Sequence, residues 1–262
     1  MKRHVMLAMA TSATLLTVAH VQADAAEVTV LSAVGVRQIM LDLGPKFERA
    51  GGHKVVNTFD STGLIVKRIA AGENVDIVII NRSGIESLAK AEKVIAFSAA
   101  DVASSITAVA VRKGAPKPDI SSADAFKRAL LSARSIARPS PALGGSSGDH
   151  ITKILERLGI ADEVNAKSVI SGRPGDMTGS PGYSVANGQA EIALHQLQEL
   201  MAVPGIEIVG PFPGDLHGTF VFSAAITSSA KEREASKALI DFLRTPDAAA
   251  AIKAKGMEPA VR

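Results

Sequence analysis

The chain has 262 residues, enough for one large or two small domains with their own hydrophobic cores. Apolar residues make up 47%, aromatic residues only 3%, and Trp is absent, so we expect a core of Ala, Val, Ile and Leu. The absence of Cys excludes disulfides, thiolate catalysis and Cys-ligated metals. The net charge of +3 is small and no basic run is interleaved with aromatic residues, so we expect no nucleic-acid partner.

Residues 1–23 have the pattern of a secretory signal peptide. Lys2-Arg3-His4 forms a basic start, and an apolar stretch rich in Ala, Leu and Val follows over about 5–21. Ala23 ends a small-x-small cleavage motif, and a cut after Ala25 fits nearly as well. A transmembrane anchor is the alternative, but the stretch is short and is broken by Thr, Ser and His. We therefore expect cleavage on export and a periplasmic mature protein.

The first part of the mature chain alternates short β-branched runs with helical patterns. The run at 75–80, which is apolar except for Asp76, is typical of a parallel strand that is buried on both faces. Alternation of this kind indicates βαβ units in a doubly wound α/β sheet. The expected strands are Glu27–Leu31, Lys54–Thr58 and Val75–Ile80, and the expected helices are Gly35–Ala50, Gly63–Ala71 and Gly84–Ala91.

A second α/β set occupies the middle of the chain. It follows an expected strand, Ile106–Val111, and a Pro/Gly-rich break near 112–118. Its expected helices are Ala123–Leu131 and Ser146–Leu158, and its expected strands are Ser135–Ala137, Ala166–Val169 and Glu191–Leu194. A second break spans 204–214, and a strand, Thr219–Ile226, and two helices, Lys231–Leu243 and Pro246–Lys255, close the chain.

The two breaks bracket the middle segment, which we interpret as a lobe inserted into a domain made of both chain ends. We predict one lobe from residues 24–110 and 210–262, and a second lobe from residues 111–209. Two crossings between lobes make a hinge, and the cleft between the lobes is the expected ligand site.

Two hydroxyl-rich turns each open onto an expected helix, at 59–63 (F-D-S-T-G) and at 144–148 (G-G-S-S-G). Helix N-termini carry unpaired N–H groups and a partial positive charge, so they attract anions. For a single Ser or Thr, helix capping is a more common role than ligand binding. For Asp60, likewise, a role as N-cap or turn residue is more common than a role in the chemistry. Two such turns in one chain nevertheless favour an anion held between two lobes.

Several motifs occur in an order and spacing that is specific for one fold. They are V-L-S-A at 30–33, F-D-S-T-G at 59–63, I-A-A-G at 69–72, V-D-I-V-I at 75–79, G-G-S-S-G at 144–148, E-I-A-L-H-Q at 191–196, F-S-A-A-I at 222–226 and A-L-I-D-F-L at 238–243. In these the chain resembles the periplasmic solute-binding proteins of the molybdate-binding family, which serve ABC importers. The resemblance covers nearly the whole mature chain and implies a type II periplasmic binding fold, in which two α/β lobes enclose a ligand cleft.

The resemblance also implies ligand contacts, since hydroxyls and backbone N–H groups at helix starts bind the anion in that family. Ser32 matches the serine of the first strand, and Ser61 and Thr62 match the second hydroxyl turn. The turn that holds Ser140 matches the third contact. Gln196 stands where the family has a binding tyrosine, which argues against molybdate as the ligand. Ser146 and Ser147, which open the next helix, are further candidates.

Arginines follow several expected strands, at the edge that faces the cleft in open α/β sheets. Arg82 and Arg138 are better placed than Arg37, and an arginine fork pairs with carboxylates in a bidentate manner. His195 follows an apolar strand, and His150 lies in the first turn of a helix. A surface arginine or a structural histidine is the alternative for each. No His-x-His or His-Glu-x-x-His pattern occurs, so we expect no metal site and no cofactor.

Two classes of function fit these features, and we expect a monomer for both. The first is a passive binding protein that delivers an oxyanion or small carboxylate to a membrane transporter, or presents it to a membrane receptor. The second is an isomerase on the same scaffold, in which a histidine moves a proton of a small tricarboxylate. For the second we expect His195 as the base, with His150 as the alternative, and Arg82 and Arg138 as clamps for carboxylates.

Overall fold

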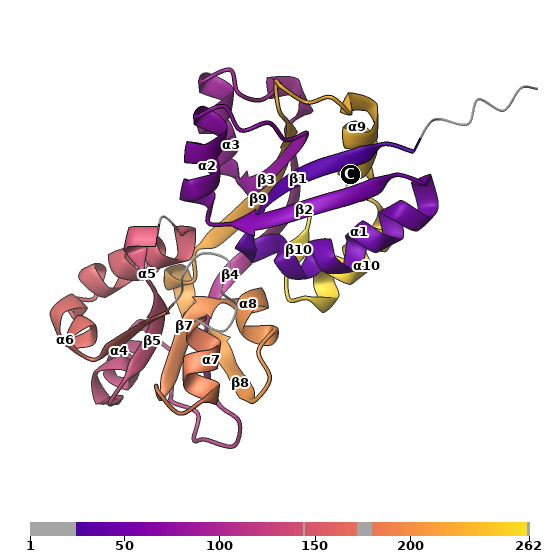
Figure 1. Cartoon of the computed structure of the whole chain (residues 1–262). Helices are drawn as coiled ribbons and strands as arrows, with labels where there is room; N and C mark the ends of the chain where they lie inside the picture. Colours follow the sequence, from indigo (N-terminus) through magenta and orange to yellow (C-terminus); the bar gives the residue numbers. More distant parts are fainter. Residues whose placement is uncertain (1–24, 144, 172–179, 261–262) are drawn as a thin grey trace, which may run out of the picture.

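The computed structural model describes residues 25–143, 145–171 and 180–260, and the predicted signal peptide lies outside them. Figure 1 shows two α/β bodies that are joined by strands passing from one to the other. Their hydrophobic cores are separate: one draws on residues 28–103 and 220–257, and the others draw on residues 108–216. We call the first body lobe 1 and the second lobe 2.

Lobe 1 contains a mixed sheet in the order β2-β1-β3-β9-β4, in which β1 is parallel to β2 and β3. Its elements are β1 (Glu27–Ala33), η1 (Val34–Val36), α1 (Arg37–Gly51), β2 (Lys54–Asp60), α2 (Thr62–Ala70), β3 (Ile77–Asn81), α3 (Arg82–Lys90), η2 (Ala96–Ser98), the first half of β4 (Ala100–Arg112), β9 (Thr219–Ile226), α9 (Arg233–Phe242), α10 (Pro246–Ala254) and β10 (Glu258–Pro259).

Lobe 2 is built on the second half of β4, in the order β4-β7-β5-β6, with β8 also pairing with β4. Its other elements are α4 (Ala123–Ser132), β5 (Ile136–Pro139), η3 (Pro141–Leu143), α5 (Ser146–Arg157), α6 (Ala161–Ala166), β6 (Ser168–Ser171), α7 (Pro181–Ala186), β7 (Ile192–Gln196), α8 (Leu197–Met201), β8 (Ile206–Pro211) and η5 (Gly214–Leu216).

The parallel strands place the functional candidates at two facing edges. The carboxyl ends of parallel strands meet at one edge of a sheet, so the ends of β1, β2 and β3 lie together in lobe 1. β5 is parallel to β6 and β7, which brings their ends together in lobe 2. Between the lobes, Thr107 of β4 receives a hydrogen bond from Phe212 N and donates its own N–H to His217 O. The returning segment therefore crosses beside Thr107.

The two-lobed α/β architecture predicted from the sequence is confirmed, and three details differ. The strand expected at 106–111 is the longer β4, which runs antiparallel to β7, β8 and β9, so the sheet is mixed. The break expected at 204–214 contains β8, because its Pro and Gly residues flank an apolar run. The helices α6, α7 and α8 have six, six and five residues, too short to show a helical period in the sequence. The lobe boundaries at 110/111 and 209/210 stay a prediction.

No helix among the described residues has the length and apolar content that a membrane crossing requires.

Candidate functional site

Ser32 and Ser61 lie at the lobe 1 edge of the site. Ser32 is completely buried near the end of β1, and its hydroxyl has no hydrogen-bond partner. Most buried hydroxyls in proteins are hydrogen-bonded, so this one has capacity for a ligand. Ser61 is the N-cap of α2, and its Oγ accepts from Leu64 N at 3.4 Å. Thr62 is the first residue of α2, so the two hydroxyl residues lie where N–H groups of the helix point outward.

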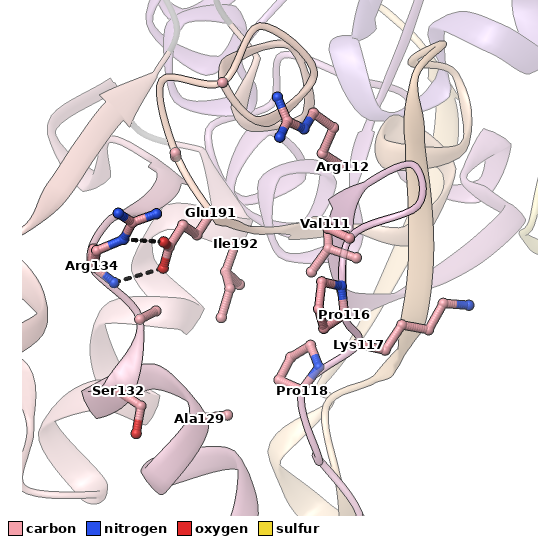
Figure 2. A pocket seen from close by; sticks show the side chains of 14 residues that line it. Val111, Arg112, Pro116, Lys117, Pro118, Ala129, Ser132, Arg134, Glu191 and Ile192 are labelled. Carbon is pink, nitrogen blue, oxygen red and sulfur yellow. Dashed lines mark hydrogen bonds and ion pairs between the residues drawn. The ribbon is translucent and has the colours of Figure 1, made fainter.

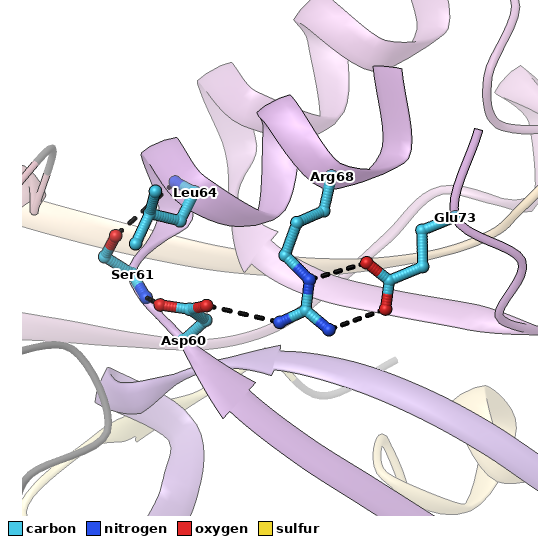
Figure 3. A network of polar contacts seen from close by, with 5 residues as sticks. All are labelled: Asp60, Ser61, Leu64, Arg68 and Glu73. Carbon is cyan, nitrogen blue, oxygen red and sulfur yellow. Dashed lines mark hydrogen bonds and ion pairs between the residues drawn. The ribbon is translucent and has the colours of Figure 1, made fainter. Parts of the chain in front are cut away.

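The charge of Asp60 beside Ser61 is compensated within lobe 1, as Figure 3 shows. Its Oδ1 accepts from Ser61 N at 2.8 Å, and its Oδ2 lies 3.2 Å from Arg68 Nη1. Arg68 also binds Glu73 through two hydrogen bonds of 2.6 Å, which raise the pKa of Arg68 and lower the pKa of Glu73. Asp60 thus supports the turn without presenting an unpaired negative charge to an anion.

Asn81 joins the two lobes, and the sequence reasoning missed it. Its Oδ1 accepts from Gly84 N at 2.9 Å, which caps α3, while its Nδ2 donates to Ser146 Oγ of α5 at 2.9 Å. A Cβ on Gly84 would lie 2.8 Å from Asn81 Oδ1 and 3.1 Å from Thr62 Cγ2, so the starts of α2 and α3 are in contact. The available signal was an Asn that directly follows an apolar strand and precedes a helical pattern.

At the lobe 2 edge, the start of α5 packs against the turn that contains Ser140. A Cβ on Gly148 would lie 2.8 Å from Ser140 O and 3.0 Å from Ser140 C, so only Gly fits this approach. Ser147 is buried in the first turn of α5, and Ser146 contacts Asn81 across the cleft. The structure therefore brings Ser140, Ser146 and Ser147 to one place, opposite the lobe 1 hydroxyls.

Arg138 of β5 is a buried cation without an acidic partner among the described residues. It is 5% exposed, its Nε donates to Ser168 Oγ at 3.0 Å, and its Nη2 donates to Asn165 Oδ1 at 2.6 Å. Its Nη1 is buried and has no hydrogen-bond partner. Burial lowers the pKa of the guanidinium, since the charged form is costly away from water. Both of its hydrogen-bond partners are neutral oxygens, so no carboxylate among the described residues neutralises the buried charge.

Arg82, by contrast, is engaged with lobe 1. It binds Asp101 through two hydrogen bonds, of which the one from Nε to Oδ1 is 3.2 Å long, and its side chain is 52% exposed. Asp101 also accepts from Ser223 Oγ at 2.6 Å. Arg37 likewise lies over the Phe59 ring, 4.8 Å from its centroid. A role for Arg82 in binding a carboxylate stays a prediction, and its pairing with Asp101 makes that role weaker than the one expected of Arg138.

His195 of β7 is 7% exposed, and both of its ring nitrogens face protein groups. Gln196 N donates to His195 Nδ1 at 2.7 Å, so the lone pair of Nδ1 is occupied. His195 Nε2 lies 3.4 Å from Glu199 Oε2, one helical turn into α8. Since Nδ1 accepts, the proton of the neutral ring is on Nε2 and faces the carboxylate.

His150 of α5 lies against the segment that returns from lobe 2 to lobe 1. Its Nε2 is 2.9 Å from Leu216 O, and its ring packs edge-on against Phe220 of β9, with 5.5 Å between centroids. A Cβ on Gly218 would lie 2.6 Å from His150 Cε1, so the ring sits directly on the backbone there. Gln198 of α8 forms a second contact between the lobes. Its Nε2 donates to Gly35 O of lobe 1 and to Gln196 Oε1, each at 2.9 Å.

A cavity of 510 Å³ lies elsewhere in lobe 2, where β4 ends and β5 and β7 begin (Figure 2). Its Arg134 is bound to Glu191 through the side chain and through the backbone N–H at 2.8 Å. Lys117 at its rim lies 3.6 Å from Glu207. Arg134 and Lys117 are thus paired with carboxylates, and the cavity is at the opposite strand ends from the predicted site residues, so we do not assign the site to it.

No group of three or more His, Asp or Glu residues in the part of the chain that the structure describes has the arrangement to hold a metal ion.

Comparisons with known proteins identify the family of this chain. Residues 28–258 match the family model described as bacterial extracellular solute-binding protein. The chain is 36% identical over 238 residues to an aconitate isomerase of a Pseudomonas species, covering 88% of this chain and 87% of that protein. It is 29% identical over 241 residues to a molybdate-binding protein of Azotobacter vinelandii, covering 89% and 90%.

Solved structures give the same fold. The periplasmic molybdate-binding protein of Azotobacter vinelandii matches with a TM-score of 0.72 and 22% identity, covering 88% of this chain and 98% of that one. The sulfate-binding protein of Mycobacterium tuberculosis matches with a TM-score of 0.72 and 18% identity, covering 90% and 87%. The two-lobed fold, the hydroxyl-lined edges and the family match lead to one conclusion: the chain belongs to the bacterial extracellular solute-binding proteins.

Proposed function

We propose that this protein is an isomerase that interconverts trans-aconitate and cis-aconitate in the periplasm. The proposal rests on the 36% identity to an aconitate isomerase over 88% of the chain, together with the chemistry of the cleft. Membership of an extracellular family and the basic, then apolar, start of the chain support export with removal of residues 1–23.

Arg138 is the single observation that carries the choice of a carboxylate substrate. A tetrahedral oxyanion can be held by hydroxyls and N–H groups alone, whereas a buried guanidinium with an unpaired Nη1 is suited to a planar carboxylate. Ser32, with its unpaired buried hydroxyl, and the helix starts at Ser61, Thr62, Ser146 and Ser147 would bind the remaining carboxylates. Ser140, which packs against the start of α5, and Gln196, which accepts from Gln198, are proposed as further neighbours of the ligand.

The proposed reaction is an allylic proton shift. A base removes a proton from the methylene carbon beside a carboxylate, and the electron pair spreads over the three-carbon allylic unit. The protonated base then returns the proton to the other end of that unit, which moves the double bond and leaves no net change in protons. Arg138 and the helix N-termini stabilise the negative charge that develops. A base with a pKa near neutrality suits both transfers, which is why a histidine is proposed for it.

A second function has its own support. The molybdate-binding relative of Azotobacter vinelandii is 29% identical over almost the same length, and the hydroxyl and N–H groups at the facing edges are typical of a passive anion-binding site. In this alternative, the protein releases an oxyanion or carboxylate to a membrane transporter without changing it.

Two measurements on the purified mature protein separate these functions. Incubation with trans-aconitate, followed by chromatography, should yield cis-aconitate at a rate proportional to protein concentration. Calorimetric titration should show binding of trans-aconitate and no binding of molybdate at the same concentrations. Tight molybdate binding without any cis-aconitate would contradict the proposal and support the passive function.

A further inference from the structure

The contacts of the two histidines distinguish the one that moves the proton, an assignment that rests on the isomerase function proposed above. A general base needs a lone pair that points away from other donors and toward the substrate. His150 and His195 are the two candidates, and the structure separates them by what their ring nitrogens contact.

His195 has no free lone pair. Its Nδ1 accepts the backbone N–H of Gln196 at 2.7 Å, and its Nε2 faces Glu199 Oε2 at 3.4 Å. An imidazole that accepts at one nitrogen and donates at the other is fully used by the protein. To act as a base, His195 would first have to break the contact with Gln196 N, although it is 7% exposed and packed within lobe 2.

His150, in contrast to His195, has a ring nitrogen whose lone pair is free within the described part of the chain. A carbonyl oxygen can only accept, so the 2.9 Å contact with Leu216 O fixes the proton on His150 Nε2. The lone pair is therefore on Nδ1, for which no hydrogen-bond partner is found among the described residues. A backbone carbonyl that holds one ring N–H and so presents the other nitrogen as a base is a common arrangement for a working histidine.

The position of His150 in the fold is also consistent with a role as the base. It lies four residues after Ser146, on the same face of α5, and Ser146 touches Asn81 of lobe 1 across the cleft. Its ring packs on Gly218 and Phe220, which belong to the segment that runs back into lobe 1. The imidazole is thus held at the junction of the lobes.

We propose that His150 is the base of the allylic proton shift and that its Nδ1 carries the proton between the two carbons. The C–H bond of the methylene breaks as the Nδ1–H bond forms, and the reverse transfer delivers the same proton or one from solvent to the other allylic carbon. In this arrangement Leu216 O sets the tautomer and stabilises the imidazolium, while the His195–Glu199 pair serves the packing of β7 against α8.

The first test compares His150→Gln with His195→Gln in the full mature protein. We expect His150→Gln to lower kcat for trans-aconitate by about 10²- to 10⁴-fold while the Kd for trans-aconitate changes only a few-fold. His195→Gln, the matched control, should keep kcat within about tenfold of the wild type, since it alters packing and not the proton path. Full kcat in His150→Gln, or loss of kcat in His195→Gln alone, would overturn the assignment and leave the isomerase function standing.

Chemical rescue separates a base from a packing residue. His150→Ala leaves room beside Gly218, and added imidazole should restore part of kcat. A folded His150→Ala protein that binds trans-aconitate and gains nothing from imidazole would overturn the proposal. Wild-type protein that yields no cis-aconitate at all would instead refute the proposed function itself.

A measurement on the unaltered protein covers the case in which the variants do not fold. Nitrogen NMR of wild-type protein labelled at histidine should show His150 with its proton on Nε2 and an Nδ1 signal that shifts on addition of trans-aconitate. A proton on Nδ1, or an Nδ1 signal that does not change when the ligand binds, would overturn the assignment.

Discussion

Among the described residues, Asp76 is the buried carboxylate of lobe 1 and Arg138 is the buried guanidinium of lobe 2, and the protein surrounds these two charges in opposite ways. Asp76 in lobe 1 and Arg138 in lobe 2 are both 5% exposed. The Asp76 carboxylate accepts from Thr29 N at 2.9 Å, Thr29 Oγ1 at 2.6 Å, Lys231 N at 2.8 Å and Glu232 N at 3.0 Å. Arg138 donates to two neutral oxygens and retains a buried nitrogen, Nη1, without a partner.

The pKa directions express the same contrast. Burial acts to raise the pKa of Asp76, but the N–H group of Glu232, the hydroxyl and N–H group of Thr29 and the N–H group of Lys231 together lower it, so the ionised form is favoured. Burial lowers the pKa of Arg138, and no carboxylate among the described residues counteracts it. A buried charge with a structural role, such as Asp76, has all its hydrogen bonds supplied by the protein. A buried charge with an unpartnered nitrogen, such as Arg138, is the better indicator of a ligand.

The largest expected effect comes from removing the satisfied charge. Asp76→Ala leaves the backbone N–H groups of Thr29, Lys231 and Glu232 without their carboxylate acceptor, so we expect the unfolding free energy to fall by about 3 kcal/mol. Urea unfolding at neutral pH checks this value. Trans-aconitate binding by whatever fraction remains folded should be unchanged, and a stable variant with weakened binding would reverse the roles assigned to the two charges.

Asp76 also predicts a dependence of stability on pH. Its pKa is lowered in the folded state, so its contribution is fully present above the unfolded value of about 3.9 and is lost as the pH falls through the folded value. Asp76→Asn should therefore lose less stability on acidification below about pH 4 than the wild type does. Equal acid sensitivity in the two proteins would show that Asp76 is not the group responsible.

Removing the incomplete charge should have the reverse effect. Arg138→Met takes away an unpaired buried cation, so we expect the unfolding free energy to stay within about 1 kcal/mol of the wild type or to rise. The Kd for trans-aconitate should weaken by about 100-fold, since a bidentate ion pair is lost. Arg138→Lys keeps the positive charge but loses the bidentate geometry, so its Kd for trans-aconitate should lie between those of the wild type and Arg138→Met. Calorimetry and urea unfolding on the same samples distinguish this role in binding from a purely structural role, for which stability would fall and the Kd would stay unchanged.

Gly148→Ala tests the shape of the lobe 2 edge. The added Cβ would meet Ser140 O at 2.8 Å, and because that atom is backbone, the start of α5 must move away from the turn. Overpacking of this kind costs about 1–3 kcal/mol. Binding should weaken as well, and Gly145→Ala in the same loop, where no atom lies within 4 Å of the added Cβ, is the control. Equal binding by both variants would mean that the start of α5 does not contact the ligand.

The smallest effect is expected for Arg82→Gln. This side chain is half exposed and paired with Asp101, and such surface pairs contribute about 0–1 kcal/mol. We expect almost unchanged stability and a Kd for trans-aconitate within a few-fold of the wild type. A loss of affinity as large as that of Arg138→Met would restore Arg82 as a substrate clamp and remove the contrast between the lobes.

The sequence predicted the fold well because its signals are local. The apolar run at 75–80 and the hydroxyl turn at 59–63 correspond to β3 and to the start of α2. The short helices of lobe 2 and the strand β8 were missed, since five or six residues carry no clear period and their Pro and Gly neighbours resemble a loop.

The site was less predictable, because it depends on partners that are distant in sequence. Arg82 and Arg138 look alike in the chain, and only Asp101, nineteen residues from Arg82, makes them different. Asn81 acquires its role from Ser146, which lies 65 residues further along the chain. Such pairings follow from tertiary packing and leave no pattern in the order of residues.

Proton NMR of the wild-type protein with trans-aconitate in deuterated buffer tests the central claim, that this solute-binding scaffold performs a proton transfer on a tricarboxylate. The account predicts new signals of cis-aconitate, with deuterium entering the methylene position as turnover proceeds. Bound trans-aconitate that persists unchanged, with neither cis-aconitate nor deuterium in its methylene group, would contradict the account and leave a carboxylate-binding protein.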